Sequence, residues 1–364
     1  MKFKSLLLVC VTCLCLMAFK SRKPRYNTAI QKTNLLIDSF MKANQIPGLA
    51  ITINRNNQTI LSKGFGYADL EQKIKVSPSK TRFRVASISK PLTADALIHL
   101  EEKGQLVLDS SIQVYLPNFP LKKGKITPRL VAGHLAGIRH YRGMEFLSSK
   151  HYNNVSDALE IFSEDSLISY PGEEFHYSSY GWNLLSSIIE QASGEKFLSY
   201  MKNKVFDPLN MRNTCADQND SIIPFRSRFY AVSPTKSLIN APYVDNSCKW
   251  AGGGFISTSE DIMKFAIAHL KEGYLSTEQI EELITPLKTT KGQSTGYGLG
   301  WHSATDKYGS FYYGHSGGAV GGTSQMVLYP QKGIVVVILC NQGSVKYNGI
   351  HNKIANLFIT SLKK

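Results

Sequence analysis

Ser87 and Lys90 are three residues apart in a segment that predicts the beginning of a helix. Residues with this spacing project from one face of an α-helix, so the hydroxyl and the amine would point into the same space. A serine hydroxyl becomes a nucleophile when a base takes its proton, and a lysine amine can be that base if its pKa is lowered. The free N–H groups at a helix start would also suit a developing oxyanion. The spacing alone is weak evidence, because six other serines of the chain also have a lysine three residues on.

A second candidate motif, Tyr177-Ser178-Ser179, follows a Pro-Gly turn and precedes a helical run. A tyrosine near a lysine ammonium ionises more readily and can pass protons. In isolation, the motif is better explained as a core aromatic residue beside a capping serine.

A third candidate motif is the segment Gly314-His315-Ser316-Gly317-Gly318, between two predicted strands. Glycines there let a substrate backbone approach closely and leave a backbone N–H open to an oxyanion. In isolation, the segment is better explained as a glycine-rich hairpin turn. Its G-x-S-x-G pattern also matches the nucleophile elbow of α/β-hydrolases. That alternative fails because no Asp or Glu follows Ser316.

The elements that must position these motifs follow from hydrophobic periodicity. Helices are predicted at residues 28–44, 87–103, 158–161, 183–191, 197–205, 260–270 and 349–362, and strands at 49–54, 59–67, 297–301, 311–315, 324–329 and 333–340. This order predicts an α/β (α+β) domain with an antiparallel sheet flanked by helices, formed by residues 26–106 and 242–364. Residues 107–241, where no clear strand is expected, would form an inserted helical lobe. A cleft between the two lobes would be the natural ligand site.

The composition suits one large globular domain. The chain has 364 residues, of which 43% are hydrophobic and 19% charged, and nothing in these values indicates disorder. The net charge of +15 is partly local, because residues 1–25 hold six of the 42 basic residues and no acid. No nucleic-acid motif and no basic run with interleaved aromatics is present, so nucleic-acid binding is not expected.

Residues 1–25 predict a signal peptide or an N-terminal anchor. A basic start is followed by an apolar run at residues 5–19, which is short for a membrane span. No clean cleavage site follows, and a second basic cluster comes next, so an uncleaved membrane anchor and a lipidated cysteine stay as alternatives. Export to the periplasm or cell envelope is expected in each case.

Metal and disulfide chemistry are not indicated. The nine histidines are scattered without a metal-binding pattern, and the three cysteines beyond the leader are widely spaced. No metal site and no cofactor are therefore expected. His134 is better explained as a structural histidine that makes local hydrogen bonds than as a ligand.

The three motifs together resemble those of serine β-lactamases and penicillin-binding proteins. They occur in the same order along the chain, as Ser87-Ile88-Ser89-Lys90, Tyr177-Ser178-Ser179 and His315-Ser316-Gly317. The His-x-Gly form of the third motif resembles the class C, esterase and D-peptidase branch, which is peptidase family S12.

The resemblance extends beyond the motifs. Residues 129–141, 240–255 and 297–301 are similar to the mitochondrial-type serine β-lactamase-like proteins and their bacterial relatives, and the similarity covers about residues 30–362. It implies a β-lactamase/transpeptidase-like fold as a single catalytic domain over residues 26–364.

The resemblance also implies catalytic roles. Ser87 would be the acylated nucleophile, and Lys90 and Tyr177 would share proton transfer, with the division between them open. The backbone N–H groups of Ser87 and Gly318 would form the oxyanion hole.

Four further residues would bind substrate by the same resemblance, namely Ser179, His315, Ser316 and Gly317. Ser179 stands where the family more often has Asn, and it is shorter with a single donor. His315 stands where β-lactamases commonly have lysine, so a fixed positive charge is lost at neutral pH unless the imidazole is protonated. Both departures weaken the case for efficient β-lactam hydrolysis and leave acyl-enzyme chemistry intact.

The implied function is a serine hydrolase that acts through an acyl-enzyme on an amide or ester bond. The mitochondrial-type resemblance favours a peptidase or esterase with a small-molecule or peptide substrate. A true class C-like β-lactamase is one alternative, and a non-catalytic penicillin-recognising sensor or scaffold is another. The sequence does not indicate an oligomeric state.

Overall fold

Strand β12 (Ile334–Cys340) lies at the centre of the sheet, and all of its residues are buried. Its side chains alternate between two cores, with Val335, Val337 and Leu339 in one and Ile334, Val336, Ile338 and Cys340 in the other. Such a continuous apolar run is what a strand covered on both faces requires. The structure, a computed structural model, describes residues 26–361.

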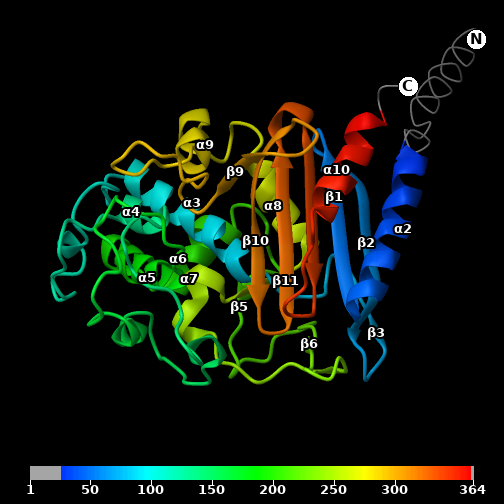
Figure 1. The fold of residues 1–364 in the computed structure, drawn as a ribbon, viewed down its shortest axis with the longest axis horizontal. Helices are drawn as coiled ribbons and strands as arrows, with labels where there is room; N and C mark the ends of the chain where they lie inside the picture. The colour runs from blue at the N-terminus through cyan, green and yellow to red at the C-terminus, as the bar shows by residue number, and fades with distance from the viewer. Residues whose placement is uncertain (1–25, 362–364) are drawn as a thin grey trace, which may run out of the picture.

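A seven-stranded sheet is built around β12 in the order β3–β2–β1–β12–β11–β10–β9, and every neighbouring pair is antiparallel (Figure 1). The other strands are β1 (Gly48–Arg55), β2 (Gln58–Asp69), β3 (Ile74–Lys75), β9 (His302–Thr305), β10 (Phe311–Ala319) and β11 (Gly322–Tyr329). The pairing of β1 with β12 joins the two ends of the chain, with Leu49 opposite Cys340 and Arg55 opposite Ile334.

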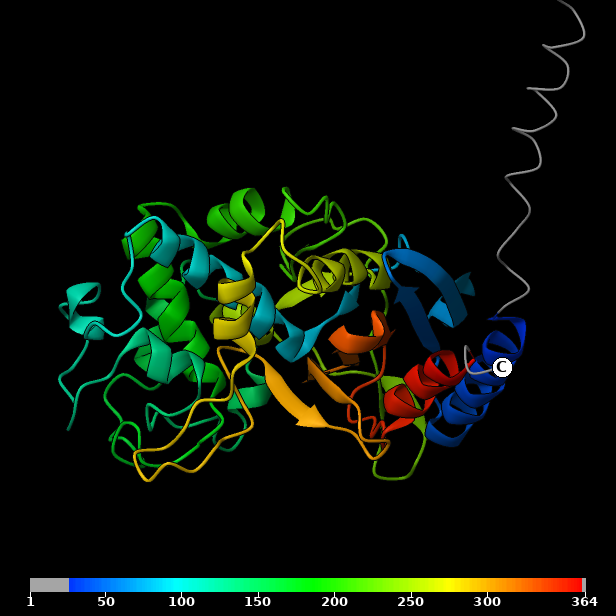
Figure 2. The ribbon, with the colours of Figure 1, turned by 90° about the horizontal axis from the view of Figure 1, so that it is seen from above.

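Helices cover both faces of this sheet. Helices α2 (Asn27–Asn44) and α10 (Ile350–Thr360) pack together on one face, where Ile37, Ile354 and Phe358 are fully buried. Helix α8 (Ser259–Ala268) packs against β1 and β12 on the opposite face, as the view from above shows (Figure 2). The predicted fold class, an antiparallel sheet flanked by helices, is confirmed.

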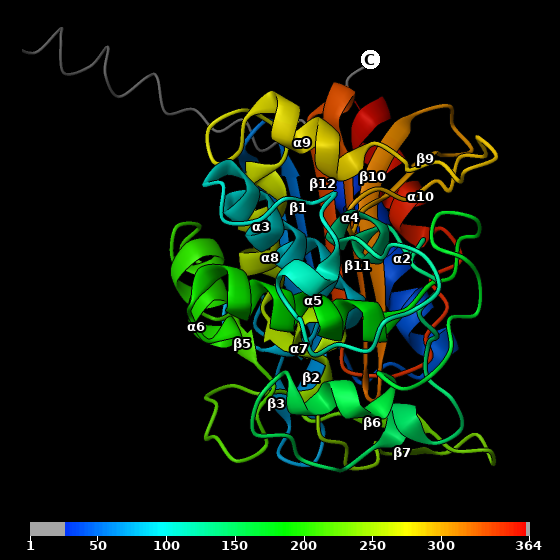
Figure 3. The ribbon, with the colours of Figure 1, turned by 90° about the vertical axis from the view of Figure 1, so that its left-hand side faces the viewer.

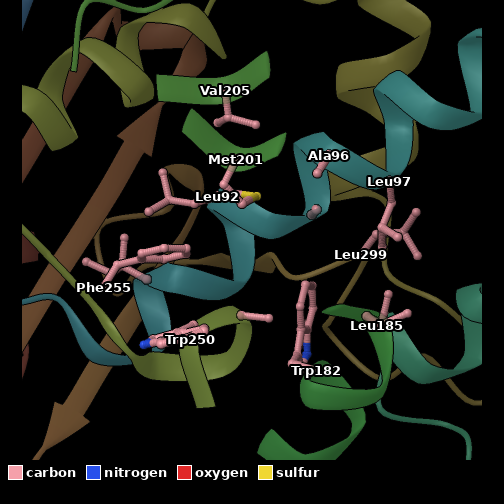
Figure 4. Close-up of a cluster of buried hydrophobic side chains, with 14 of the residues drawn as sticks. Leu92, Ala96, Leu97, Trp182, Leu185, Met201, Val205, Trp250, Phe255 and Leu299 are labelled. Carbon is pink, nitrogen blue, oxygen red and sulfur yellow. The ribbon is translucent and has the colours of Figure 1, made fainter. Parts of the chain in front are cut away.

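A group of helices beside the sheet holds the candidate nucleophile (Figure 3). Its members are η2 (Ala86–Ile88), α3 (Ser89–Glu102), α4 (Pro128–Ala132), α5 (Ser179–Ser193), α6 (Phe197–Met201), η7 (Ser247–Lys249) and α7 (Trp250–Gly253). Helix α3 is buried along almost its whole length, including its polar residues Lys90 and Asp95. Figure 4 shows Leu92 of α3 near Met201 and Phe255, with Trp182 and Trp250 packed on the other side of the helix. This packing fixes the start of α3 in the interior.

One sequence-based prediction of secondary structure is wrong. Residues 297–301 form a loop and not a strand, because the N–H of Leu299 bonds the carbonyl of Leu283 at the end of α9 (Thr277–Ile284), at 2.8 Å. The helix predicted at residues 158–161 is present as a short 3-10 helix, η5 (Asp157–Ile161).

No clear strand is expected in the region 107–241, and the structure has only very short ones there. Strands β5 (Cys215–Ala216), β6 (Tyr230–Val232) and β7 (Leu238–Asn240) are two or three residues long, too short to show an alternating pattern. Strand β5 joins β4 (Phe83–Arg84) and β8 (Phe255–Ser257) in a small separate sheet.

The predicted leader or anchor, residues 1–25, lies outside the described residues. Within residues 26–361, none of the helices combines the length and the apolar character needed to cross a bilayer.

Candidate active site

Ser87 lies on the 3-10 turn η2, two residues before the regular helix α3 begins. The preceding residue, Ala86, has a φ of +49°, a left-handed conformation that is strained for a residue with a Cβ. Hydrogen bonds to Val85 hold this conformation: its N–H donates to the carbonyl of Phe255 at 3.1 Å, and its carbonyl accepts from Ser324 Oγ at 2.7 Å. Strands β8 and β11 thus fix the backbone that presents the serine.

The amine of Lys90 lies 3.1 Å from Ser87 Oγ. It also lies 3.2 Å from Ser179 Oγ and 2.5 Å from the carbonyl oxygen of Gly252. Lys90 is 0% exposed, and burial without a counter-charge lowers its pKa well below the usual value. A neutral amine has two N–H groups for Ser179 and Gly252, which leaves its lone pair for the hydroxyl of Ser87. This geometry suits a base that takes the serine proton.

Tyr177 and Ser179 flank the start of α5. Ser178 caps this helix, because its Oγ accepts the N–H three residues on at 3.1 Å. The ring of Tyr177 lies 4.8 Å from Lys90 Nζ. Burial raises the pKa of Tyr177, and its hydrogen bond with the hydroxyl of Ser87 offsets the rise only in part. Tyr177 therefore keeps its proton, in contrast to the readily ionised tyrosine that the sequence suggested.

Two histidines hold the start of α5, and the sequence analysis singled out only one of them, His134. His134 Nδ1 accepts the N–H of Ser178 at 3.1 Å, and His140 Nδ1 accepts the N–H of Ser179 at 3.1 Å. His134 thus has a structural hydrogen bond, as predicted, but the bond is long-range and not local, because Ser178 is 44 residues further along the chain. His140 gave no signal in the sequence, because it reaches the helix from a loop of irregular structure.

His315 is buried and uncharged in this site. Its Nδ1 lies 2.5 Å from the carbonyl oxygen of Ser316, which can only accept, so the proton is on Nδ1. Its Nε2 lies 2.8 Å from the hydroxyl of Tyr297 and accepts from it. Burial, followed by the charge of Lys90, lowers the pKa of His315 to about 3. The fixed positive charge that lysine supplies at this position in β-lactamases is therefore missing.

Strand β10 comes close to the nucleophile through Gly317. A Cβ at Gly317 would lie 2.3 Å from Ser324 Oγ and 2.4 Å from the carbonyl oxygen of Val85, so only glycine fits. The next residue, Gly318, is exposed, and a Cβ there would meet nothing within 4 Å. Pairing with β9 ends at Gly314, so β9 does not cover the rest of the edge of β10.

A cavity of about 300 Å³ opens in front of Ser87. Six of the predicted site residues line it, namely Ser87, Tyr177, Ser179, His315, Ser316 and Gly318. The two others are buried: Lys90 contacts Ser87, and Gly317 lies against the backbone of Val85. Residues that the sequence did not single out also line the cavity, among them His140, Lys249 and Gly252.

Metal ligands do not gather in the described part of the chain. Within residues 26–361, no group of three or more His, Cys, Asp and Glu side chains is placed to hold an ion.

Comparison with known proteins agrees with this fold. Residues 34–356 match the family described as Beta-lactamase. The mitochondrial serine beta-lactamase-like protein LACTB of Mus musculus is 32% identical, over 91% of this chain and 80% of that protein. A penicillin-binding protein homologue from Pyrococcus abyssi, described as octameric, aligns with a TM-score of 0.79 and 25% identity, over 92% of this chain and 77% of that chain. A D-amino acid amidase from Ochrobactrum anthropi aligns with a TM-score of 0.78 and 21% identity, over 93% and 99%.

The fold and the Ser-x-x-Lys site define a protein of the penicillin-binding and β-lactamase class. The chain belongs to the beta-lactamase family, which matches nearly its whole described length. The resemblance inferred from the three motifs is confirmed. Its relatives include the serine beta-lactamase-like protein LACTB, so the predicted class of activity, a serine hydrolase, is confirmed at the level of the family.

Proposed function

We propose that this protein hydrolyses an amide or ester bond through an acyl-enzyme on Ser87. One observation carries the proposal: Ser87 Oγ lies 3.1 Å from the buried amine of Lys90, whose pKa is lowered well below its usual value. In the first step, the bond from Oγ to the acyl carbon forms and the bond to the leaving amine or alcohol breaks. Water then cleaves the acyl ester, which releases the acid and regenerates the serine.

Lys90 is the proposed base. Its pKa is lowered by burial, whereas burial raises the pKa of Tyr177, so at neutral pH the lysine is the group better prepared to accept a proton. Tyr177 keeps its proton, contacts the serine hydroxyl and would pass a proton to the leaving group. We thus assign the role of base to Lys90 and the role of acid to Tyr177, which the sequence left open.

The N–H groups of Ser87 and Gly318 are the proposed oxyanion hole. Gly318 is exposed on the segment of β10 that β9 leaves uncovered. An uncovered strand edge can also pair with an extended substrate, and Ser316 is exposed beside it as a hydroxyl for that substrate. Two further residues would hold the site in place. Ser179 contacts the amine of Lys90, and His315 donates a hydrogen bond to the carbonyl of Ser316.

A peptidase or esterase fits the site better than a β-lactamase. The lysine that commonly neutralises an antibiotic carboxylate is replaced by His315, which burial keeps neutral. Proteins that share this fold include a D-stereospecific amidohydrolase and an acyltransfer-competent hydrolase, both supporting amide or ester chemistry in general.

We propose that residues 107–241 form the lobe that faces the sheet across the substrate cleft. We further propose that residues 1–25 direct the chain to the periplasm or cell envelope, with or without membrane attachment.

An intact-mass experiment tests the proposed function. The protein is mixed with panels of peptides, aryl esters and β-lactams, and the mass of the protein is followed over time. A transient adduct with product release supports a hydrolase, and turnover of esters or peptides faster than of β-lactams supports the peptidase or esterase assignment. A permanent adduct indicates a penicillin-recognising sensor and overturns the hydrolase proposal.

A further inference from the structure

Lys249 lies in the wall of the same cavity as Ser87 and has no part in the chemistry described above. It ends the turn η7, directly before α7, whose Gly252 carbonyl holds Lys90. Its amine lies 5.6 Å from the ring centre of Tyr141 and 5.3 Å from that of Phe146, and both rings line the cavity. Lys249 is only 5% exposed.

The amine of Lys249 has few partners. Its hydrogen bond within the described residues is to the carbonyl oxygen of Phe146, at 3.2 Å. An ammonium has three N–H donors, so most of its capacity is unused. Burial lowers the pKa of Lys249, and an anion bound beside the amine would stabilise its charged form.

The neighbouring carboxylates are already engaged. Asp217 pairs with Arg84 at 2.7 Å. Asp245 lies 3.0 Å from a nitrogen of His151 and accepts the N–H of Ser247 at 2.8 Å. No carboxylate of the described residues lies within ion-pair distance of Lys249, as the ion pairs of residues 26–361 involve other side chains.

The rest of the cavity supplies no other cation for a ligand. His315 is uncharged, and the amine of Lys90 is committed to Ser87 and Gly252. The guanidinium of Arg84 is committed to Asp217 and to the carbonyl of Val320. Lys249 is thus the cavity-lining group with spare capacity for an anion.

We propose that Lys249 binds a carboxylate of the substrate, away from the bond that is cleaved, and so selects substrates that carry such an acid group. Lys249, at the end of η7, would supply the positive charge that a lysine on strand β10 supplies in β-lactamases and that His315 does not. This inference rests on the proposed function. The carboxylate could be the free C-terminus of a peptide or the carboxylate of a bicyclic β-lactam, which present the same chemistry.

A matched pair of substrates tests the inference. The acid member is p-nitrophenyl hydrogen glutarate and the neutral member is its methyl ester, and kcat/KM is measured for each. The wild type is expected to favour the acid, and Lys249→Met, which removes the charge and keeps the length, should reduce this selectivity roughly 10- to 100-fold, mainly through KM. Lys249→Arg should retain most of it. Lys353→Met, an exposed lysine on α10, serves as the matched control and should leave the selectivity unchanged.

The outcomes separate the two proposals. Equal selectivity in the wild type and Lys249→Met overturns the inference even when a fluorophosphonate labels Ser87. A wild-type preference for the neutral ester overturns it without any variant, so misfolding of Lys249→Met cannot rescue it. Failure of the wild type to react with the fluorophosphonate overturns the proposed function itself. Two further substrate pairs identify the source of the carboxylate. One pair is a peptide with a free or an amidated C-terminus, and the other is a penicillin and its methyl ester. The source is the pair whose selectivity is lost in Lys249→Met.

Discussion

At the scale of single residues, the site depends on burial more than on charge pairing. Lys90 is enclosed by hydroxyl and carbonyl groups without a carboxylate partner, and this lowers its pKa. The same enclosure raises the pKa of Tyr177 and lowers that of His315. Burial thus shifts the pKa of each of these three groups in the direction that favours its neutral form, which is what a neutral base beside the serine requires.

Replacing Lys90 by Met should abolish acylation without unfolding the protein. The variant keeps most of the side-chain volume and removes the proton acceptor, so the acylation rate should fall by about 100-fold or more. Stopped-flow or intact-mass kinetics with an aryl ester measure the rate, and circular dichroism reports the fold. Lys103→Met, an exposed lysine at the end of the same helix, is the matched control. Near-normal turnover in Lys90→Met would mean that the base is misassigned.

The pH dependence of Tyr177→Phe distinguishes the two candidate bases. The acylation rate should rise with pH, because the protonated lysine below its pKa cannot accept the serine proton. Removing the tyrosine hydroxyl should lower the plateau but leave this rise in place, since Lys90 causes it. Rate profiles of wild type and variant between pH 5 and 9 provide the measurement. Loss of the rise in the variant would identify Tyr177 as the base.

At the scale of elements, the site depends on the close approach of β10 to η2. Gly317 allows the strand to lie against the backbone of Val85, and Ser324 of β11 bonds the same residue. The turn with Ala86 at φ +49° is thus clamped between a helix start and the sheet. Displacing the strand would move both the proposed oxyanion donors and the nucleophile.

Gly317→Ala should therefore impair both stability and acylation. The new Cβ would lie closer than 2.5 Å to two atoms. Overpacking of this kind typically lowers the free energy of unfolding by about 1–3 kcal/mol. Gly318→Ala introduces the same methyl group one residue on, where nothing lies within 4 Å, and should leave the melting temperature unchanged. Thermal unfolding of the two variants gives the comparison. Equal melting temperatures would show that the strand does not need to lie against η2.

The sequence predicted the order of the elements and the main motif residues of the site, but not every contact that assembles them. The apolar runs of β1 and β12 and the helical spacing of α2 and α10 are local patterns, so they could be recognised. Gly252, His140 and Tyr297 contribute through long-range contacts to Lys90, Ser179 and His315, and no local pattern marks them. The loop at residues 297–301 was mistaken for a strand, because buried apolar residues there resemble one.

At the scale of the whole molecule, burial of neutral histidines makes stability depend on pH. Burial lowers the pKa of His315 to about 3 and that of His351 to about 4, and it lowers the pKa of His134 well below its usual value. In the unfolded chain these groups have ordinary values near 6.5. As pH falls below that value, the unfolded state binds protons that the folded state does not, so stability is lost.

The free energy of unfolding should fall between pH 7 and pH 4.5. A single such histidine contributes on the order of 2 kcal/mol to the loss over this range. Urea unfolding at several pH values measures the slope. His315→Gln should flatten it relative to the wild type, whereas His176→Gln, on a partly exposed side chain, should not. An unchanged slope in His315→Gln would mean that this imidazole titrates normally.

The most direct test of the central claim is covalent labelling by a fluorophosphonate, read by intact mass and peptide mapping. We predict a single adduct on the wild type, located on Ser87, and no adduct on Ser87→Ala. Wild-type protein that stays unlabelled while folded, or that carries the adduct on another residue, would contradict the account.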